Sequence, residues 1–273
     1  MICSHFFRFA RPMKSRWVLW FVALLPQSPV LADLPDSIVK VKPSVVIVGT
    51  FKSTNSPRFA LRGTGFAVVD PLKSGGSNLV VTNAHVLQSP ADADPDAALV
   101  VQVRQGATDL QMRAATVLEV DSVHDLALLK IDGPAVPAMT LRDSDTVREG
   151  QSVAFMGFPI GGALGFSPVT HRAIVSSIAA AALPTPTAQT LNAQVIRSLR
   201  SASPFNIFQL DGTAYPGNSG GPLFDPDTAE LLGVVNMVLL KSTRESALSS
   251  PSGISYAIPA KFVAQLLKRQ NGN

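Results

Sequence analysis

The sequence predicts an all-β protein made of two β units that are followed by a C-terminal helix. Short segments rich in Val, Ile and Leu recur between Gly, Pro, Asn and Asp residues, as is typical of strands separated by turns. A Pro-containing stretch, residues 133–151, divides these segments into two sets. The last segment, 260–270, has apolar residues at helical spacing and basic residues near its end, which predicts a helix lying on the second unit.

The first 32 residues have the layout of a secretory signal peptide. Basic residues precede the apolar run WVLWFVALL at 17–25, Pro26 interrupts it, and the small-residue context VLA at 30–32 favours cleavage before Asp33. This run is shorter than the about 20 apolar residues that span a bilayer. The sequence therefore predicts an exported protein, periplasmic or secreted, with no stable membrane insertion after cleavage of the signal peptide. An uncleaved membrane anchor is the alternative.

Removal of this segment also removes the excess of positive charge. The chain has 23 Lys and Arg residues against 19 Asp and Glu residues, and the four bases of the segment account for the difference. A neutral balance gives no argument for binding nucleic acid. Because the only cysteine, Cys3, lies in the same segment, the mature chain is expected to hold neither a disulfide nor a thiolate-metal site. No metal and no organic cofactor is expected.

Several elements are predicted in order after the signal peptide. Residues 31–43 predict a short helix that begins at Asp36 or Ser37 and ends at Pro43. The β segments that follow favour an antiparallel barrel or sandwich. We expect the first unit to span 33–140 and the second 141–273. The predicted strands are 44–50, 63–70, 78–83, 97–104, 115–121 and 126–132 in the first unit, and 152–158, 173–179, 206–211, 231–240 and 253–258 in the second.

An excursion, residues 180–204, lies between two predicted strands of the second unit. Its middle has apolar residues at helical spacing, Leu191, Val195 and Leu199, which indicate a short helix. Because the excursion precedes the serine-containing turn, it is expected either to cover that turn or to be a tolerated surface insertion.

The stretch YPGNSGGPLFD, residues 215–225, places Ser219 among glycines and prolines. Glycine permits positive φ and close approach of the backbone, and proline fixes the flanks. Such a turn can hold a nucleophile beside convergent N–H groups. A plain β-turn is the alternative, because Asn, Gly and Ser are ordinary turn residues.

A serine nucleophile needs a base, and histidine is the usual one because its ordinary pKa of about 6.5 leaves it neutral near pH 7. Outside the signal-like segment the chain has His85, His124 and His171. His85 follows an apolar strand, and Asp125, at the start of the apolar segment LALLKI, could fix its tautomer. A core histidine and a turn aspartate are the alternatives. Strand alternation is expected to direct His124 into solvent, and His171 is expected at the surface of a strand.

The motifs TNAHV, DLALLKI and GNSGGPL, in this order, resemble the three catalytic signatures of trypsin-like serine proteases, specifically the bacterial, disulfide-free HtrA/Deg branch. Further segments, among them VKPSVVIV, LRDSDTVREGQSVAFMGFPIG and GISYAIPAKFV, extend the resemblance over residues 36–268. The resemblance implies two six-stranded antiparallel β-barrels with a C-terminal helix. It also implies a serine endopeptidase, a hydrolase, in which Ser219 is the nucleophile, His85 the general base and Asp125 the orienting carboxylate. The N–H groups of Gly217 and Ser219 would form the oxyanion hole.

The resemblance further implies substrates and assembly. We expect exported, partly unfolded proteins or peptides as substrates, in a role in protein quality control. The family's specificity pocket would be lined here by Ala214, Met237 and Val238, and the absence of an acid at these positions predicts cleavage after small or medium apolar residues. Family members commonly carry PDZ domains, and none is expected in this chain. They also commonly form trimers, so a homo-trimer is one expected state, and the oligomeric state stays open.

Two other functions compete with the protease. A chaperone-like or binding protein could keep the fold with a latent active site, and an esterase could use the same three residues. Labelling of the serine by a fluorophosphonate separates the first alternative, and comparison of casein with p-nitrophenyl esters separates the second.

Overall fold

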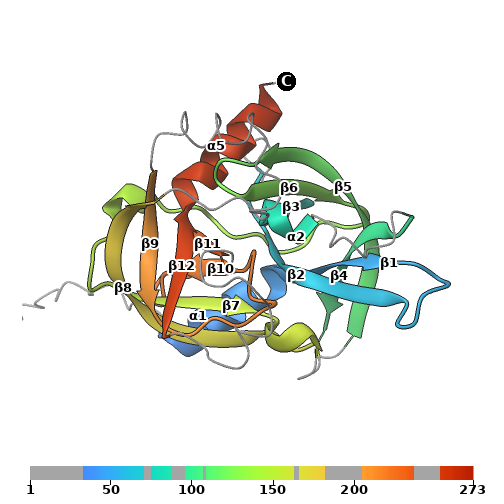
Figure 1. Cartoon of the computed structure of the whole chain (residues 1–273), viewed down its shortest axis with the longest axis horizontal. Coiled ribbons are helices and arrows are strands. Elements are labelled where there is room, and N and C mark those ends of the chain that lie inside the picture. Colours follow the sequence, from blue (N-terminus) through green and yellow to red (C-terminus); the bar gives the residue numbers. More distant parts are fainter. Residues whose placement is uncertain are drawn as a thin grey trace, which may run out of the picture. The chain divides into compact units, whose positions relative to one another are not determined.

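A computed structural model describes residues 33–70, 75–87, 96–106, 109–162, 166–181, 205–236 and 253–272. The strands form two closed six-stranded barrels with antiparallel pairing between neighbours (Figure 1). The first barrel consists of β1 (Val45–Phe51), β2 (Phe59–Ala67), β3 (Leu79–Thr82), β4 (Ala98–Gln105), β5 (Asp109–Asp121) and β6 (Leu126–Ile131). The second consists of β7 (Ser152–Gly157), β8 (Val169–Ala181), β9 (Phe205–Asp211), β10 (Pro222–Phe224), β11 (Leu231–Asn236) and β12 (Ile254–Pro259).

Neighbouring strands follow the same order around both barrels. It is β1-β2-β3-β6-β5-β4 in the first and β10-β11-β12-β9-β8-β7 in the second. The predicted all-β fold with two six-stranded barrels is therefore confirmed. The strand missed by sequence reasoning is β10, because it has three residues and follows the glycine-rich turn directly. The helix expected around residues 191–199 lies outside the described residues.

Short helices precede, connect and follow the strands. The helices are α1 (Leu34–Val41), α2 (Ala84–Leu87) and α5 (Ala260–Asn271), and the 3₁₀ turns are η1 (Lys42–Ser44), η2 (Ser144–Thr146) and η3 (Pro159–Gly162). The predicted start of α1 at Asp36 or Ser37 is wrong. The carboxylate of Asp33 accepts a hydrogen bond from the N–H of Leu34 at 2.7 Å, so the helix begins three residues earlier than the acidic residue suggested. None of the helices in these described ranges is long and apolar enough to cross a bilayer.

Apolar side chains fill each barrel and the seam between them. Val48 and Val101 belong to the interior of the first barrel, and Phe155 and Phe208 belong to that of the second. A third cluster joins both barrels to α5, whose Phe262 and Leu266 are buried in it. Because burial of apolar surface is the main favourable term in folding, this shared cluster holds the barrels together.

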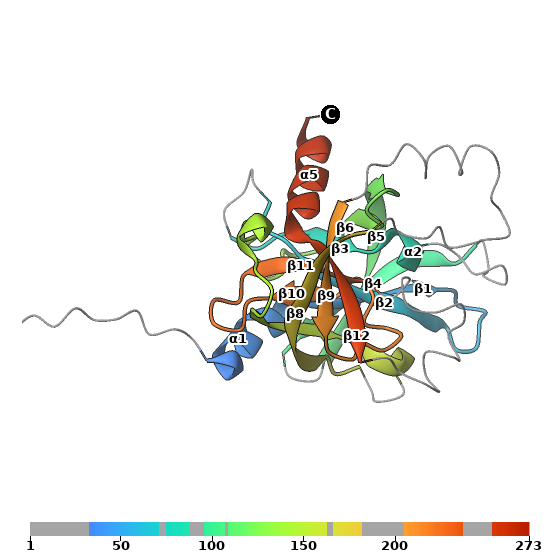
Figure 2. The ribbon, with the colours of Figure 1, turned by 60° about the vertical axis from the view of Figure 1, so that its left-hand side comes forward.

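Helix α5 packs on both barrels, whereas the sequence predicted contact with the second only. It contacts β5 and β6 of the first barrel as well as β11 and β12 of the second (Figures 1 and 2). Its last turn binds the first barrel through Arg269, whose guanidinium lies 2.7 Å from the carboxylate of Asp121. The prediction was incomplete because the partner charge, Asp121, is distant in sequence.

The connection between the barrels is hydrogen-bonded to both of them through neighbouring residues. Met139 donates its N–H to Ala67 of the first barrel at 2.9 Å, and the N–H of Val69 returns to Met139 at 3.0 Å. The next residue, Thr140, already accepts a hydrogen bond from Leu231 of the second barrel at 2.8 Å. The chain therefore passes from one barrel to the other between two consecutive residues.

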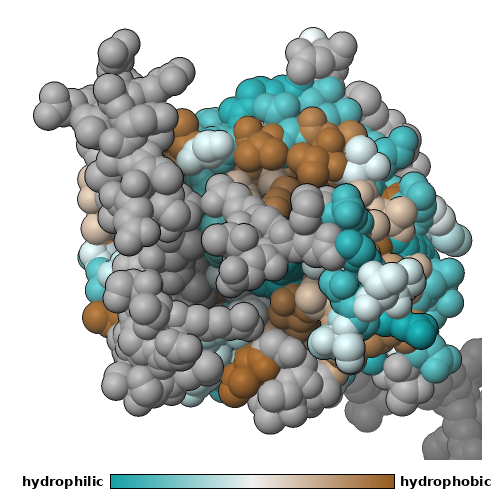
Figure 3. Space-filling model, turned by 45° about the vertical axis from the view of Figure 1, so that its right-hand side comes forward, coloured by the Kyte–Doolittle hydropathy of each residue, from teal (hydrophilic) through white to brown (hydrophobic). Residues whose placement is uncertain are grey.

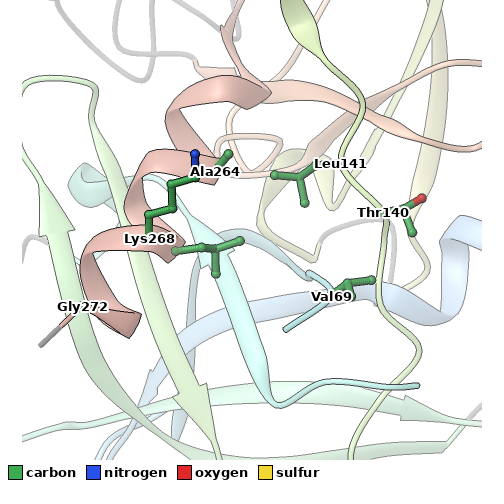
Figure 4. Close-up of a pocket in the computed structure, with 7 residues that line it drawn as sticks. Val69, Thr140, Leu141, Ala264, Lys268 and Gly272 are labelled. Atoms are coloured by element: carbon green, nitrogen blue, oxygen red, sulfur yellow. The ribbon is translucent and has the colours of Figure 1, made fainter. Parts of the chain in front are cut away.

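A hollow of about 560 Å³ lies between this connection and α5. Figure 4 shows Ala264 and Lys268 on the helix facing the segment that carries Thr140 and Leu141. None of its described lining residues is one of the predicted site residues. The described lining consists of Val69, Thr140, Leu141, Ala264, Leu267, Lys268 and Gly272.

The surface carries scattered apolar residues. On the face drawn in Figure 3, hydrophobic residues form separate patches bordered by hydrophilic ones. Val117, Val120 and Val123, in and just after β5, are among the exposed large hydrophobic residues of the described part of the chain. Scattered exposure of this kind is normal for a folded protein and identifies no site by itself.

Candidate active site

The predicted nucleophile, Ser219, directly follows a tight turn at residues 215–218. Residues 215–220 together are called the serine turn below. The N–H of Asn218 donates to the carbonyl of Tyr215 at 2.9 Å, and Gly217 has φ of 103°. Proline at the second position and a positive-φ glycine at the third are the pattern of a type II turn. The carbonyl of Pro216 accepts a hydrogen bond from Ile160 at 2.7 Å. Because a trans peptide directs C=O and N–H to opposite sides, the N–H of Gly217 points away from Ile160.

Two backbone N–H groups of the serine turn have no acceptor among the described residues. Within the ranges that the structure describes, neither the N–H of Gly217 nor that of Ser219 has a hydrogen-bond partner, although both residues are buried. Buried backbone N–H groups are nearly always paired. Two N–H groups without partners, beside a serine, are the arrangement that an oxyanion hole requires.

The turn is seated directly on the first barrel. The carbonyl of Ser219 accepts a hydrogen bond from the N–H of Thr64 in β2 at 2.9 Å. The hydroxyl of Thr64 donates to the carbonyl of Gly217 at 2.6 Å. Gly220 has φ of 83°, and a Cβ there would lie 2.2 Å from the carbonyl oxygen of Thr64 and 3.1 Å from the N–H nitrogen of Asn83. Only glycine fits this contact, so the turn lies against the residue that precedes α2.

The predicted base and its carboxylate lie together on the first barrel. Nδ1 of His85, in α2, lies 2.5 Å from Oδ2 of Asp125, and the N–H of His85 donates to Oδ1 at 2.8 Å. Asp125 has φ of 51°, an uncommon conformation for a residue other than glycine. Its carbonyl accepts hydrogen bonds from Ala84 at 3.1 Å and from the side chain of Asn83 at 3.0 Å. When Nδ1 carries the proton, Nε2 is left as an acceptor.

The segment that carries His85 meets the serine turn across Gly63. A Cβ on this glycine would lie 2.8 Å from Val86, the residue after His85, and 2.9 Å from the carbonyl oxygen of Ser219. A single glycine therefore separates α2 from the serine turn. The structure brings His85 and Asp125 into contact and places the turn of Ser219 beside them.

Asn236, which directly precedes the predicted pocket residues Met237 and Val238, contacts the candidate carboxylate. Its Nδ2 donates to Oδ2 of Asp125 at 2.7 Å, and its side chain is fully buried. It ends β11 of the second barrel, so this hydrogen bond joins the barrels at the predicted carboxylate. The signal in the sequence was a polar residue at the end of the apolar run LLGVV.

The prediction for His124 was wrong. Its Nδ1 lies 2.8 Å from Oδ2 of Asp121, and its ring stacks on Phe262 of α5 with the centroids 3.8 Å apart. Residues 122–125 form a turn, so strand alternation does not apply to them. Burial raises the pKa of Asp121, but the hydrogen bonds from His124 and Arg269 outweigh it and hold the pKa of this carboxyl well below its usual range.

His171 lies in a strand, as predicted, but its side chain is half-buried against the serine turn instead of being exposed. The residue is in β8, where its ring stacks on Phe155 with centroids 4.7 Å apart and an angle of 13° between the planes. Nε2 lies 3.4 Å from Nδ2 of Asn218. Burial lowers the pKa of His171. Sequence reasoning missed this contact because β8 and the serine turn are far apart along the chain.

The predicted pocket residues are described only in part. Ala214 is buried, and its N–H donates to the hydroxyl of Ser255 at 2.8 Å. Met237 and Val238 lie outside the described residues. Their contribution to a specificity pocket stays a prediction.

Comparison with known proteins agrees with this geometry. Residues 63–234 match the family described as the trypsin-like peptidase domain. The chain is 30% identical over 260 residues to the mitochondrial serine protease HTRA2 of Drosophila willistoni, which covers 95% of this chain and 49% of the relative. It is 31% identical over 205 residues to a probable periplasmic DegP-like serine endoprotease of Marinomonas sp., covering 75% of this chain and 34% of the relative.

Solved structures point to the same branch. The HtrA-type protease AlgW with a tripeptide has a TM-score of 0.58 and 26% identity, over 86% of this chain and 62% of the solved chain. The chain spans about half or less of the length of the two curated relatives. The family match covers more than half of the chain. The chain therefore belongs to the family described as the trypsin-like peptidase domain, and the relatives and solved structures it is similar to are HtrA-type serine proteases.

Proposed function

We propose that this chain cleaves exported, partly unfolded proteins, with Ser219 as nucleophile, His85 as general base and acid, and Asp125 as orienting carboxylate. The observation that carries the proposal is the seating of the serine turn on β2, through the Thr64 hydrogen bonds, beside the His85–Asp125 pair. The serine-bearing turn, the imidazole and the carboxylate come from three separate segments, and the packing of the turn against β2 and Asn83 supports their convergence. Such convergence is the requirement of a serine protease triad.

Acylation begins when Oγ of Ser219 attacks the carbonyl carbon of the scissile peptide bond. Nε2 of His85 accepts the serine proton as the new C–O bond forms, and the carbonyl oxygen becomes negative. The N–H groups of Gly217 and Ser219 donate to that oxygen, and loss of one such donor typically costs about 10²- to 10³-fold in rate. His85 then gives its proton to the leaving amine, the C–N bond breaks, and an acyl-enzyme remains.

Deacylation repeats the same proton transfers with water. His85 takes a proton from the water molecule as its oxygen attacks the acyl carbon. The bond to Oγ of Ser219 then breaks, and His85 returns the proton to the serine. Asp125 stays ionised throughout and stabilises the imidazolium, while Asn236 holds the carboxylate from the second barrel.

Substrate and location belong to the proposal as well. The AlgW structure contains a tripeptide, one relative is described as periplasmic, and another is mitochondrial. The signal-like segment before Asp33 favours export and periplasmic or secreted residence. We propose cleavage after small or medium apolar residues, with Ala214, Met237 and Val238 lining the pocket. The homo-trimer stays a prediction that sedimentation would measure.

The test is covalent labelling by a fluorophosphonate, followed by mass spectrometry of the tagged peptide. We expect the tag on Ser219, and we expect Ser219→Ala and His85→Ala to abolish both the tag and casein cleavage. Ser176→Ala is the matched control, because this exposed serine in β8 lies outside the candidate site and its hydroxyl donates to the carbonyl of Gln209. A peptide library assayed with the same protein should show slower cleavage after Lys than after Val or Ala.

Three outcomes would contradict the proposal. Absence of label on a folded chain that still binds unfolded protein would favour the latent, chaperone-like alternative. Hydrolysis of p-nitrophenyl esters without cleavage of casein would favour an esterase. A tag on a residue other than Ser219 would remove the triad assignment.

A further inference from the structure

His171 is a third histidine close to the predicted chemistry, and the proposed mechanism does not use it. It follows Val169 and Thr170 at the start of β8 and pairs with Phe155 in β7. Its ring stacks on that same phenylalanine, so its orientation is fixed by the wall of the second barrel. This stack aims Nε2 at the side chain of Asn218, 3.4 Å away.

Asn218 lies between the two residues whose N–H groups form the proposed oxyanion hole. Its side chain is fully buried, and its Oδ1 has no hydrogen-bond partner among the described residues. Gly157 leaves it room, because a Cβ there would lie 2.7 Å from Oδ1 and 3.0 Å from the Cα of Asn218. The contact with His171 is thus the only hydrogen bond of this side chain within the described ranges.

We propose that His171 is a positioning residue for the oxyanion hole, which it holds through the side chain of Asn218 only while its imidazole is neutral. This inference rests on the proposed function of the serine turn. A neutral ring can accept a hydrogen bond from Nδ2 of Asn218 through Nε2. A protonated ring presents N–H at Nε2, so two donors would face each other.

Protonation would therefore force the Asn218 amide to rotate and present its unpaired Oδ1 to the imidazolium. Rotation of this fully buried side chain disturbs the backbone on both of its sides, where Gly217 and Ser219 supply the oxyanion donors. The long distance of 3.4 Å in the unprotonated arrangement leaves room for a stronger, charge-assisted bond in the rotated one. Acid would thus exchange one orientation of the turn for another.

The surroundings of the ring favour the neutral form. Neither β7 nor the described turn from Thr213 to Gly221 carries a charged residue, and Tyr215 is the titratable group they bring near, with ring centroids 6.3 Å apart. On β8 itself, Arg172 is exposed and lines a separate hollow with Asp211. Burial lowers the pKa of His171, so the neutral ring persists below the pH at which a free histidine titrates.

Two substitutions separate positioning from packing. His171→Phe keeps the stack on Phe155 and removes the acceptor, whereas His171→Gln keeps a neutral acceptor and removes the titration. We expect His171→Phe to lower kcat about 10-fold with unchanged KM and melting temperature, as for loss of one hydrogen bond acting on the transition state. We expect His171→Gln to restore most of kcat and to shift the acid limb of the pH profile. Arg172→Gln, whose side chain lies on the opposite face of β8, is the control and should behave as the wild type.

An NMR titration tests the contact without activity. In isotope-labelled Ser219→Ala protein, the side-chain amide signals of Asn218 should shift with the same midpoint as the His171 ring, below about pH 6.5. The shift should vanish in His171→Phe. Two results would overturn the inference. The Asn218 signals could stay unchanged while His171 titrates, or the His171→Phe enzyme could keep the wild-type kcat and pH profile. If the Ser219→Ala protein hydrolyses peptides as fast as the wild type does, it is the proposed function that is contradicted. The NMR titration then decides by itself whether His171 holds Asn218.

Discussion

The two barrels contribute halves of the site that are held in different ways. On the first barrel, the His85–Asp125 pair is fixed largely by side chains, and Asn83 and Asn236 both direct their amides to Asp125. On the second barrel, the turn of Ser219 is fixed chiefly through main-chain atoms, such as the bond from Thr64. Close packing against glycine completes the second half.

This difference determines how each half can be damaged. A half held by side chains loses function when a single donor or acceptor is removed. A half held by backbone has few side chains to remove, so the corresponding damage is the addition of atoms where glycine leaves no space. The following predictions apply one change of each kind and then test the helix that supports the first half.

Asp125→Asn should have the largest effect. The substitution replaces one accepting oxygen by an NH2 donor. Because both oxygens of Asp125 contact His85, an NH2 group facing Nδ1 would favour the wrong tautomer of the imidazole, and kcat should fall about 10⁴-fold as in serine triads generally. Peptide hydrolysis measured under single-turnover conditions checks this. Asp145→Asn is the control, because that carboxylate is exposed and binds Lys261 at the start of α5. A fall of less than tenfold would show that Asp125 does not orient the base.

Gly157→Ala should have the next largest effect. The new Cβ would lie 2.7 Å from Oδ1 and 3.0 Å from Cα of Asn218, and 3.0 Å from the hydroxyl of Thr64. These contacts displace the serine turn, and a misplacement of this size can cost about 10²-fold in kcat. Gly253→Ala is the control, since nothing lies within 4 Å of its Cβ position. Equal activity of the two variants would mean that the turn accommodates the methyl group.

Acid should weaken the anchor between α5 and the first barrel, with the smallest effect of the three. Because the pKa of folded Asp121 lies below its value of about 3.9 in the unfolded chain, the carboxylate stabilises the fold above that pH. This contribution is lost as pH falls from about 4 toward the folded pKa. Asp121→Asn should lower the free energy of unfolding at neutral pH by about 1–3 kcal/mol and flatten its fall in acid.

Urea denaturation of the Ser219→Ala protein between neutral and acidic pH measures this effect without self-cleavage. Asp145→Asn again serves as control, because Asp145 is 67% exposed whereas Asp121 is 6% exposed. Surface ion pairs contribute about 0–1 kcal/mol. An unchanged pH dependence in Asp121→Asn would show that the anchor does not depend on this carboxylate.

The sequence was sufficient for the architecture because strand periodicity and turn residues are local signals. Eleven of the strands were predicted as segments, and β10 was missed since three residues carry no periodicity. The capping of α1 was misplaced because Asp33 competes with Asp36 for the same role. Such errors are confined to the boundaries of elements.

The surroundings of the candidate site could not be predicted to the same extent. His85 and Asp125 were paired from their motifs, but the contact from Asn236 joins strands of different barrels and has no local signal. His124 and His171 were both expected at the surface, and tertiary packing against Phe262 and Phe155 leaves both of them half-buried. The side chain of a polar residue is buried by partners that only the folded chain brings together.

The bond from Arg269 to Asp121 has a consequence for the biogenesis of the protein. Synthesis proceeds from the N-terminus, so the loop that ends at Asp125 leaves the ribosome long before α5, which braces it. Asn236 also emerges later than the carboxylate it holds. A nascent chain therefore cannot complete the proposed catalytic apparatus until nearly the whole domain has been made.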